Sequence, residues 1–386
     1  MTAPLIIIGS GMAGIGLLKQ IRALDAERPV TLITADSGDD YSKPLLSTGF
    51  SKRLPPQRLA ARTALDVADQ LSAVVRTHTR VTSIDTQERV LVIGEERLAW
   101  SELVLATGAA PAMPFTLPDE IVGRVFSIND LDDYRRFHST LGTLGRPARV
   151  AIVGAGLVGC EFANDLTAGG HEVTLIAPEK APLSRLLPDP LGRVLGEAFV
   201  EAGMVLNLGH GIRRLAQSGS DVGLLLEDGS CVQADLVLLA TGLQPRIELA
   251  REAGIEAGAA GIQVDRYLQS SIEGVFALGD VACVDGVNAM YVQPLQAGAK
   301  ALARTLCGTP TPVSYGAWPV LVKTPLLPVV AMPPLQTPAR WRVEGAGQDL
   351  AAFAEDQDER LIGFALTGSC VKRKVELARA TPPLLG

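Results

Sequence analysis

The stretch Ile6–Gly14, which reads IIIGSGMAG, decides the fold of this 386-residue chain. Three consecutive isoleucines predict a buried strand, and glycines at the spacing G-x-G-x-x-G follow directly. In this motif Gly9 makes the tight turn, Gly11 lets a pyrophosphate approach the backbone, and Gly14 lets helix and strand pack closely. The start of the following helix offers free N–H groups and a partial positive charge to phosphates. The stretch therefore predicts a dinucleotide-binding unit.

The same pattern returns later in the chain. Residues 151–159 read AIVGAGLVG, and each copy is followed by a helical pattern and then by an identical strand, VTLI, at 30–33 and 173–176. Each copy also ends on the turn Ala-Thr-Gly, first at 106–108 and again at 240–242. A repeat of this kind predicts two related dinucleotide-binding domains in one chain.

An acidic residue follows each copy of the motif. Asp36 stands 22 residues after Gly14, where a carboxylate would accept hydrogen bonds from a ribose. Glu179 stands 20 residues after Gly159 and is the corresponding candidate, although a proline occupies the more usual acidic position just before it. We expect NADH at the second site. NADPH stays open as an alternative, because the basic residues Lys180 and Arg185 follow closely and could meet a 2′-phosphate.

Prolines mark where the chain crosses between domains. The run 111–118 reads PAMPFTLP and predicts a linker, and a second crossing is expected at 242–245. After about residue 312 the pattern changes to short, proline-rich strands and a terminal helix-like stretch. The predicted fold is α/β, with two Rossmann-like, three-layer β/β/α domains and a small C-terminal α+β domain. The predicted division is 1–112 with 246–312 for the first domain, 113–245 for the second and 313–386 for the third.

Composition excludes several classes of protein. Hydrophobic residues make up 47% of the chain and charged residues 20%, which is not the composition of a disordered protein. The net charge of −7 argues against nucleic acid as a partner. Apolar runs such as 236–240 are far shorter than the roughly 18 residues of a membrane span, and the N-terminus carries no leader pattern. We expect a cytoplasmic protein without membrane insertion.

The five cysteines lie far apart, with no C-x-x-C motif and no cluster with histidine. We expect buried free thiols and no metal site.

Several motifs together resemble a known family. They are the loop 9–14, the run YSKPLLS at 41–47, the two Ala-Thr-Gly turns, the segment 154–161 and the run FALGD at 276–280. In this order they resemble the FAD-dependent pyridine nucleotide reductases with two nucleotide domains, a group that includes glutathione reductase and the reductases of ferredoxin-type carriers. The run 42–52 and the short C-terminal domain most resemble the rubredoxin–NAD(+) reductases of bacterial alkane hydroxylation.

The resemblance implies FAD in the first domain and NADH in the second. The cofactor-binding residues it implies are Gly9, Ser10, Gly11, Met12, Ala13, Gly14, Ala35, Asp36, Lys43, Pro44, Val81, Ala106, Thr107, Gly108, Gly154, Gly156, Leu157, Val158, Gly159, Glu161, Glu179, Thr241, Gly242, Gly279, Asp280, Val292 and Lys323.

Particular roles follow from the resemblance. Asp280 would accept a hydrogen bond from the FAD ribitol or lie by the phosphates. The amide of Val292 or Gln293 would face flavin O2 at a helix start, with Pro294 at the first helical position. A strand-end aspartate and a plain helix cap are the alternative interpretations.

The catalytic candidates are Lys43 and Glu161. The resemblance places both beside flavin N5, and we expect them to form an ion pair between the domains, since a buried ammonium needs an anion. Lys323 is expected to contact the flavin, where related ferredoxin-type reductases have an aromatic residue. The alternative interpretation of all three is a solvated or edge-strand charge.

The route of the electrons is predicted from an absence. Disulfide reductases of the resembled family use cysteines in the early part of the first domain, but positions 41–52 contain none. Electrons should therefore leave the flavin directly and singly. The expected acceptor is rubredoxin, a small acidic iron protein that would dock on a basic rim. Rim candidates are Lys43, Lys52, Arg53, Lys300, Arg304 and Lys323.

Three alternatives stay open. One is a ferredoxin reductase of an oxygenase system, another is an NADH oxidase or quinone-type reductase, and the third is a flavoprotein that senses NADH without catalysis.

Overall fold

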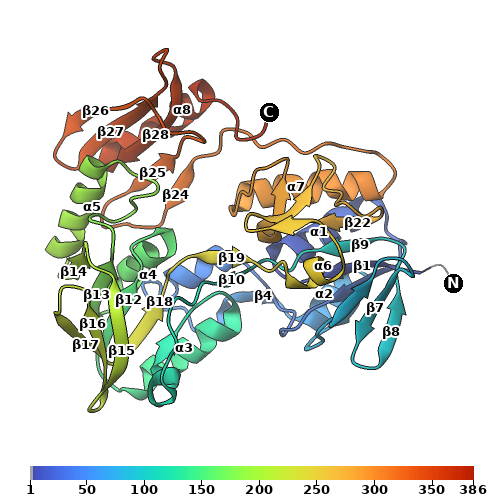
Figure 1. Cartoon of the computed structure of the whole chain (residues 1–386), viewed down its shortest axis with the longest axis horizontal. Coiled ribbons are helices and arrows are strands. Elements are labelled where there is room, and N and C mark those ends of the chain that lie inside the picture. The colour runs from blue at the N-terminus through green and yellow to red at the C-terminus, as the bar shows by residue number, and fades with distance from the viewer. Residues whose placement is uncertain (1–2) are drawn as a thin grey trace.

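Two five-stranded parallel sheets form the centre of the computed structural model, which describes residues 3–386 (Figure 1). The first sheet has the order β22-β9-β1-β2-β5 and consists of β1 (Leu5–Ile8), β2 (Val30–Ile33), β5 (Val74–Arg76), β9 (Leu103–Leu105) and β22 (Val275–Ala277). The second has the order β11-β18-β12-β13-β14 and consists of β11 (Val125–Phe126), β12 (Arg149–Val153), β13 (Glu172–Ala177), β14 (Val205–Leu208) and β18 (Leu236–Leu239).

The predicted repeat is confirmed strand by strand. The two VTLI strands are β2 and β13, and each pairs in parallel with the strand that precedes its glycine loop: Leu5 lies opposite Val30, and Val150 lies opposite Val173. All four residues of β1 and of β2 are buried, as expected of parallel strands that are covered on both faces. Helices α1 (Met12–Leu24) and α4 (Leu157–Ala168) begin within the two glycine motifs, directly after Gly11 and Gly156.

A small antiparallel sheet completes each repeat between its third parallel strand and its Ala-Thr-Gly turn. These sheets give both repeats the predicted three-layer β/β/α form. The first contains β6 (Ser83–Asp85), β7 (Val90–Ile93) and β8 (Glu96–Ala99), and the second β15 (Ile212–Ser218), β16 (Asp221–Leu226) and β17 (Cys231–Ala234). The remaining helices of this region are α2 (Ala64–Gln70), α3 (Leu131–Thr143), α5 (Asp189–Glu201), α6 (Glu248–Glu252) and α7 (Val292–Leu306). Further short strands are β3 (Asp40–Tyr41), β4 (Ala60–Arg62), β20 (Ala257–Gly258), β21 (Gly261–Val264) and β23 (Ala282–Val284).

The two crossings between the repeats form one ribbon. Strand β10 (Ala109–Pro111) pairs antiparallel with β19 (Leu243–Pro245), so that Ala110 lies opposite Gln244 (Figure 1). Pro111, the first residue of the predicted linker, therefore belongs to a strand. The ribbon supports the division of the chain near residues 112 and 245, which we keep as our proposal.

The C-terminal part is an antiparallel sheet with one covering helix. Its order is β24-β25-β28-β27-β26, and its elements are β24 (Val320–Val322), β25 (Val329–Met332), β26 (Arg340–Ala346), β27 (Asp349–Glu355), β28 (Leu361–Thr367) and α8 (Lys374–Ala380). One face of the sheet, with Val322, Val329 and Ala352, shares a hydrophobic core with the second repeat. Figure 1 shows this sheet beside α5, which contacts β28. In the described residues, no helix is both long and apolar enough to cross a membrane.

Candidate active site

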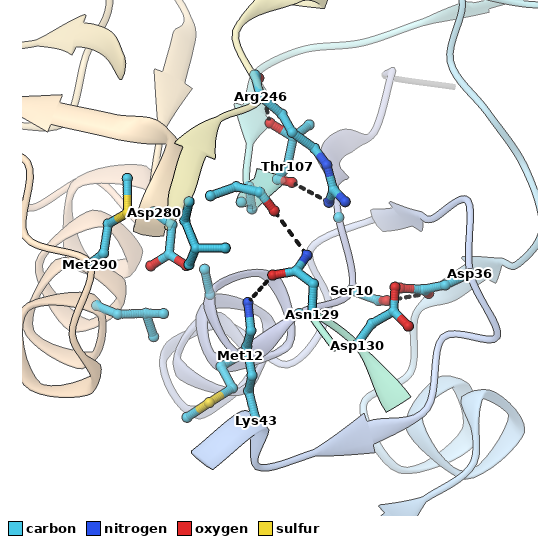
Figure 2. Close-up of a pocket in the computed structure, with 18 of the residues that line it drawn as sticks. Ser10, Met12, Asp36, Lys43, Thr107, Asn129, Asp130, Arg246, Asp280 and Met290 are labelled. Carbon is cyan, nitrogen blue, oxygen red and sulfur yellow. Dashed lines mark hydrogen bonds between the residues drawn. The ribbon is translucent and has the colours of Figure 1, made fainter. Parts of the chain in front are cut away.

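A cavity of about 780 Å³ lies at the carboxyl ends of the first parallel sheet (Figure 2). Residues from all three parts of the chain line it. Its volume is within the range of cofactor pockets, about 300–1,000 Å³. The predicted site residues that line it are Gly9, Ser10, Gly11, Met12, Ala13, Ala35, Asp36, Lys43, Pro44, Val81, Ala106, Thr107, Gly108, Leu157, Val158, Glu161, Asp280, Val292 and Lys323.

The first glycine loop is closed on its protein side and open on its cavity side. Gly9 has φ +112°, and a Cβ there would lie 2.2 Å from the carbonyl oxygen of Ala106. A Cβ on Gly14 would lie 1.9 Å from the carbonyl oxygen of Gly9. Gly11 differs, because a Cβ there would meet no protein atom within 4 Å. The backbone at Gly11 is therefore open to the cavity at the start of α1, as a diphosphate requires.

The second loop repeats this packing. Gly154 has φ +109°, and its Cβ would lie 2.3 Å from the carbonyl oxygen of Ala240; a Cβ on Gly159 would lie 1.9 Å from the oxygen of Gly154. Gly156 again has no protein atom within 4 Å of a Cβ. Each Ala-Thr-Gly turn thus packs directly on the loop of its own repeat, which explains why loop and turn recur together.

Hydrogen bonds to one of its two carboxylate oxygens fix the side chain of Asp36. Its Oδ1 accepts hydrogen bonds from Ser10 Oγ at 2.9 Å, Thr34 Oγ1 at 2.6 Å and the Gly38 amide at 2.9 Å. No donor among residues 3–386 bonds to Oδ2, and Asp36 lines the cavity. The carboxylate is thereby fixed while one oxygen stays available to the hydroxyls of a ribose.

Lys43 and Asp280 bring opposite charges to the same cavity (Figure 2). Burial lowers the pKa of Lys43, an effect that the charge of Asp280 opposes. Burial raises the pKa of Asp280, against the influence of Lys43. Lys43 Nζ donates to Asn129 Oδ1 at 2.7 Å, whereas the Asp280 carboxylate accepts no hydrogen bond from the described residues. A ligand hydroxyl could donate to this half-buried carboxylate.

The predicted Lys43–Glu161 ion pair is wrong. Glu161 is 5% exposed, and it pairs with Lys323 Nζ. Glu161 also accepts from Ser47 Oγ at 2.8 Å and from the Lys323 amide at 3.1 Å. The physical reason is that β24 of the C-terminal sheet brings Lys323 onto the carboxylate, while the tip of Lys43 is held by Asn129.

Two neighbours of Glu161 were missed by the sequence reasoning. Asp165, 2% exposed, accepts from the Phe50 amide at 3.1 Å and the Ser51 amide at 2.8 Å. Asn164 Oδ1 accepts from the Leu326 amide at 3.2 Å. Positions i, i+3 and i+4 share a helix face, so this polar face of α4 (Glu161, Asn164 and Asp165) joins the second repeat to the segment 47–51 and to the C-terminal part. Polar residues at that spacing in an otherwise apolar helix were the available signal.

The other predicted site residues lie outside the cavity. Gly14 and Gly279 support its wall, since a Cβ on Gly279 would lie 2.8 Å from that of Ala13. Gly154, Gly156, Gly159, Glu179, Thr241 and Gly242 belong to the carboxyl end of the second sheet. Glu179 is half-buried, and Lys180 and Arg185 are exposed. The first turn of α4 links the two places, because Leu157 and Val158 follow the second loop and line the cavity.

Helix α7 presents its first turn to the cavity through Val292 and Gln293. It begins at Val292, so Pro294 is its third residue and the predicted start is corrected by two positions. Of the basic rim candidates, Lys43 and Lys323 line the cavity. The others, Lys52, Arg53, Lys300 and Arg304, are exposed and lie outside its lining.

None of the cysteines lies on this cavity wall in the described part of the chain. Cys160 is buried in α4, where burial raises the pKa of its thiol. The other four are free thiols, and Cys231 is exposed.

Two regions of the chain match known protein families. Residues 3–301 match the pyridine nucleotide-disulphide oxidoreductase family, and residues 312–381 match the rubredoxin binding C-terminal domain. A rubredoxin–NAD(+) reductase of Alcanivorax borkumensis is 42% identical over 99% of both chains. A nitric oxide reductase FlRd–NAD(+) reductase of Aeromonas salmonicida is 38% identical over 98% of this chain and 96% of its own.

A solved structure shares the fold. The putidaredoxin reductase in its covalent complex with putidaredoxin superposes with a TM-score of 0.88 at 23% identity, over 98% of this chain and 94% of that one. The two matched regions, the full-length relatives and the repeated βα loops agree: this chain belongs to the pyridine nucleotide-disulphide oxidoreductase family.

Proposed function

We propose that this chain is an NADH-dependent rubredoxin reductase that passes electrons from NADH through FAD to rubredoxin. One observation carries the proposal: a C-terminal part that matches the rubredoxin-binding domain lines the same cavity as the first glycine loop. FAD, when bound, accepts two electrons from NADH and can release them singly to a one-electron carrier. The full-length relative named rubredoxin–NAD(+) reductase supports the same acceptor.

The cavity fits FAD on the protein's own features. Gly11 leaves its backbone open for the diphosphate, and Asp36 keeps one oxygen available for the ribose. Asp280 is a half-buried carboxylate that lines the cavity without a protein donor in the described residues, so a cofactor hydroxyl could donate to it. We propose that these three residues hold the cofactor.

Two groups would stabilise negative charge on the reduced cofactor. The Lys43 ammonium points into the cavity, and the first turn of α7 presents the amides of Val292 and Gln293 there. The N-terminus of a helix carries a partial positive charge. Fixed positive groups of this kind favour a reaction in which negative charge develops.

The acceptor must approach the cavity itself, because no cysteine of the described residues lines it to relay electrons. Val320, Leu321 and Lys323 reach the cavity wall from the rubredoxin-binding part of the chain. A carrier docked on that part would therefore lie close to the cofactor.

We place NADH at the second loop. Leu157 and Val158 extend from that loop to the cavity and would guide the nicotinamide toward FAD. Glu179, half-buried beyond β13, would bind the ribose hydroxyls and repel a 2′-phosphate.

The downstream system that we propose is alkane hydroxylation in the cytoplasm, where dehydrogenases produce NADH. The FlRd acceptor of a nitric oxide reductase is the second candidate, favoured by the relative at 38% identity. The test is a steady-state assay with NADH and three carriers: rubredoxin, FlRd and a ferredoxin-type carrier. We expect kcat/KM to be highest for rubredoxin. Higher efficiency with FlRd would select the second candidate, and a preference for the ferredoxin-type carrier would contradict both.

A further inference from the structure

Asn129 holds the Lys43 ammonium in place. Lys43 Nζ donates to Asn129 Oδ1 at 2.7 Å, and no other acceptor among residues 3–386 bonds to this nitrogen. Asn129 is itself only 7% exposed. Figure 2 shows the lysine pointing at the amide, with Asp280 on another side of the pocket.

Asn129 is fixed at three of its four polar groups. Its Nδ2 donates to the carbonyl oxygen of Ala109 at 2.9 Å, its backbone N–H donates to Asp133 Oδ2 at 3.0 Å, and its Oδ1 faces Lys43. Ala109 lies in the crossing strand β10, and Asp133 lies in the first turn of α3. Asn129 itself lies between β11 and α3, in the second repeat, whereas the lysine comes from the first.

The acceptor is neutral, although carboxylates lie nearby. Asp130 caps α3 by accepting from the Asp133 amide at 2.8 Å, and Asp133 accepts from Asn129. Glu161 is paired with Lys323. An amide oxygen orients an ammonium without neutralising its charge, whereas a bonded carboxylate would cancel it.

We propose that Asn129 is the positioning residue of Lys43, and that its neutral amide keeps the full charge of the ammonium available to the cofactor. This inference rests on the proposed function, in which the cofactor gains negative charge on reduction. The second repeat would then influence the electrostatic environment of the cofactor, because its residue Asn129 positions the Lys43 ammonium.

A double-mutant cycle tests the inference on FAD-loaded protein. The variants are Asn129→Ala, Lys43→Met and their combination, and the readouts are the midpoint potential of the bound flavin and the rate of its reduction by NADH in stopped flow. Asn129→Ala should move the potential to a more negative value and slow reduction about tenfold, roughly the effect of one hydrogen bond to a charged group. In the Lys43→Met background the same change should have no further effect. Equal effects in both backgrounds would assign Asn129 a merely structural role and overturn the inference.

A second variant keeps the shape of the side chain and changes its charge. Asn129→Asp would bond Lys43 through a carboxylate, so the potential should become more negative than in Asn129→Ala. Gln87→Glu is the matched control, because Gln87 is exposed in a turn and makes no side-chain hydrogen bond within residues 3–386. An equal shift in Asn129→Asp and Gln87→Glu would overturn the inference.

Measurements on the wild-type protein distinguish a failure of the role of Asn129 from a failure of the proposed function. If it holds FAD and reduces rubredoxin but Asn129→Ala leaves the potential unchanged, only the role of Asn129 fails. If it holds no FAD, the proposed function fails and the inference with it.

Discussion

We propose that Gly11 serves the cofactor, whereas Gly9 and Gly14 serve the fold. A Cβ on either of the latter would lie within about 2.2 Å of a backbone oxygen, but a Cβ on Gly11 meets only the open cavity. We therefore expect Gly11→Val to fold and to lose most of its FAD, since the side chain would stand where the diphosphate approaches. The measurement is the ratio of flavin to protein absorbance, together with Tm.

Gly16→Val is the matched control for this prediction. Gly16 lies in α1, the helix that begins directly after Gly11, and its Cβ would also meet no protein atom within 4 Å, but it does not line the cavity. It should retain FAD. Full FAD content in Gly11→Val would show that the loop binds something else.

The charge at Glu179 should decide the choice between the two nicotinamide cofactors. A carboxylate near a 2′-phosphate costs about 1–3 kcal/mol at short range. We expect the wild type to prefer NADH, and Glu179→Ala to raise kcat/KM for NADPH relative to NADH about tenfold. The alanine variants of the exposed residues Lys180 and Arg185 are the comparison variants. If they lose activity with NADPH and Glu179→Ala changes nothing, Lys180 and Arg185 bind the 2′-phosphate.

The Lys43 ammonium should impose an alkaline limit on flavin reduction. Burial lowers its pKa from the usual 10.5, so the proton leaves at a lower pH than from an exposed lysine. The charged form predominates below that pKa, and its stabilising effect is lost as the pH rises through it. The rate of flavin reduction by NADH should fall on the alkaline side. Lys43→Met should be slower throughout and should lack this fall; the same alkaline limb in the variant would assign it to another group.

At the scale of elements, the polar face of α4 should hold the neighbouring segment 47–51 in place. Asp165→Asn would put an NH₂ group or a poorer acceptor against the amides of Phe50 and Ser51, which now donate to its carboxylate. We expect a loss of about 1–3 kcal/mol in the free energy of unfolding, measured by urea denaturation. Asp69→Asn is the control, because Asp69 is exposed in α2. An equal change in the two variants would remove the special role of Asp165.

Elements with a local sequence signal could be predicted, whereas contacts between them could not. The loops, the VTLI strands and the Ala-Thr-Gly turns each carry their signal within a few residues, and the structure has them in register. The partner of Glu161 is set instead by how β24 lies against α4, across 162 residues of sequence. For the same reason Asn129, which belongs to no motif, had no signal that could connect it with Lys43.

At the scale of the whole molecule, electrons should reach rubredoxin without any thiol. None of the cysteines lines the cavity among the residues described, and Cys160 and Cys283 are buried. Alkylation with iodoacetamide should therefore leave NADH-dependent reduction of rubredoxin essentially intact. Mass spectrometry would verify modification of exposed Cys231, and flavin absorbance would verify that FAD is retained. Strong inactivation with FAD retained would contradict direct transfer.

The ribbon of β10 and β19 has a consequence for how such reductases diversify. Because Ala110 and Gln244 lie opposite each other, the segment between the two strands enters and leaves its host at neighbouring points. Recombination could replace that segment as a unit without straining the backbone of the rest of the chain. The replacing segment would have to carry Asn129 and the polar face of α4 as well. The electron donor could then change in one genetic event, while the flavin pocket and the carrier-docking domain are inherited intact.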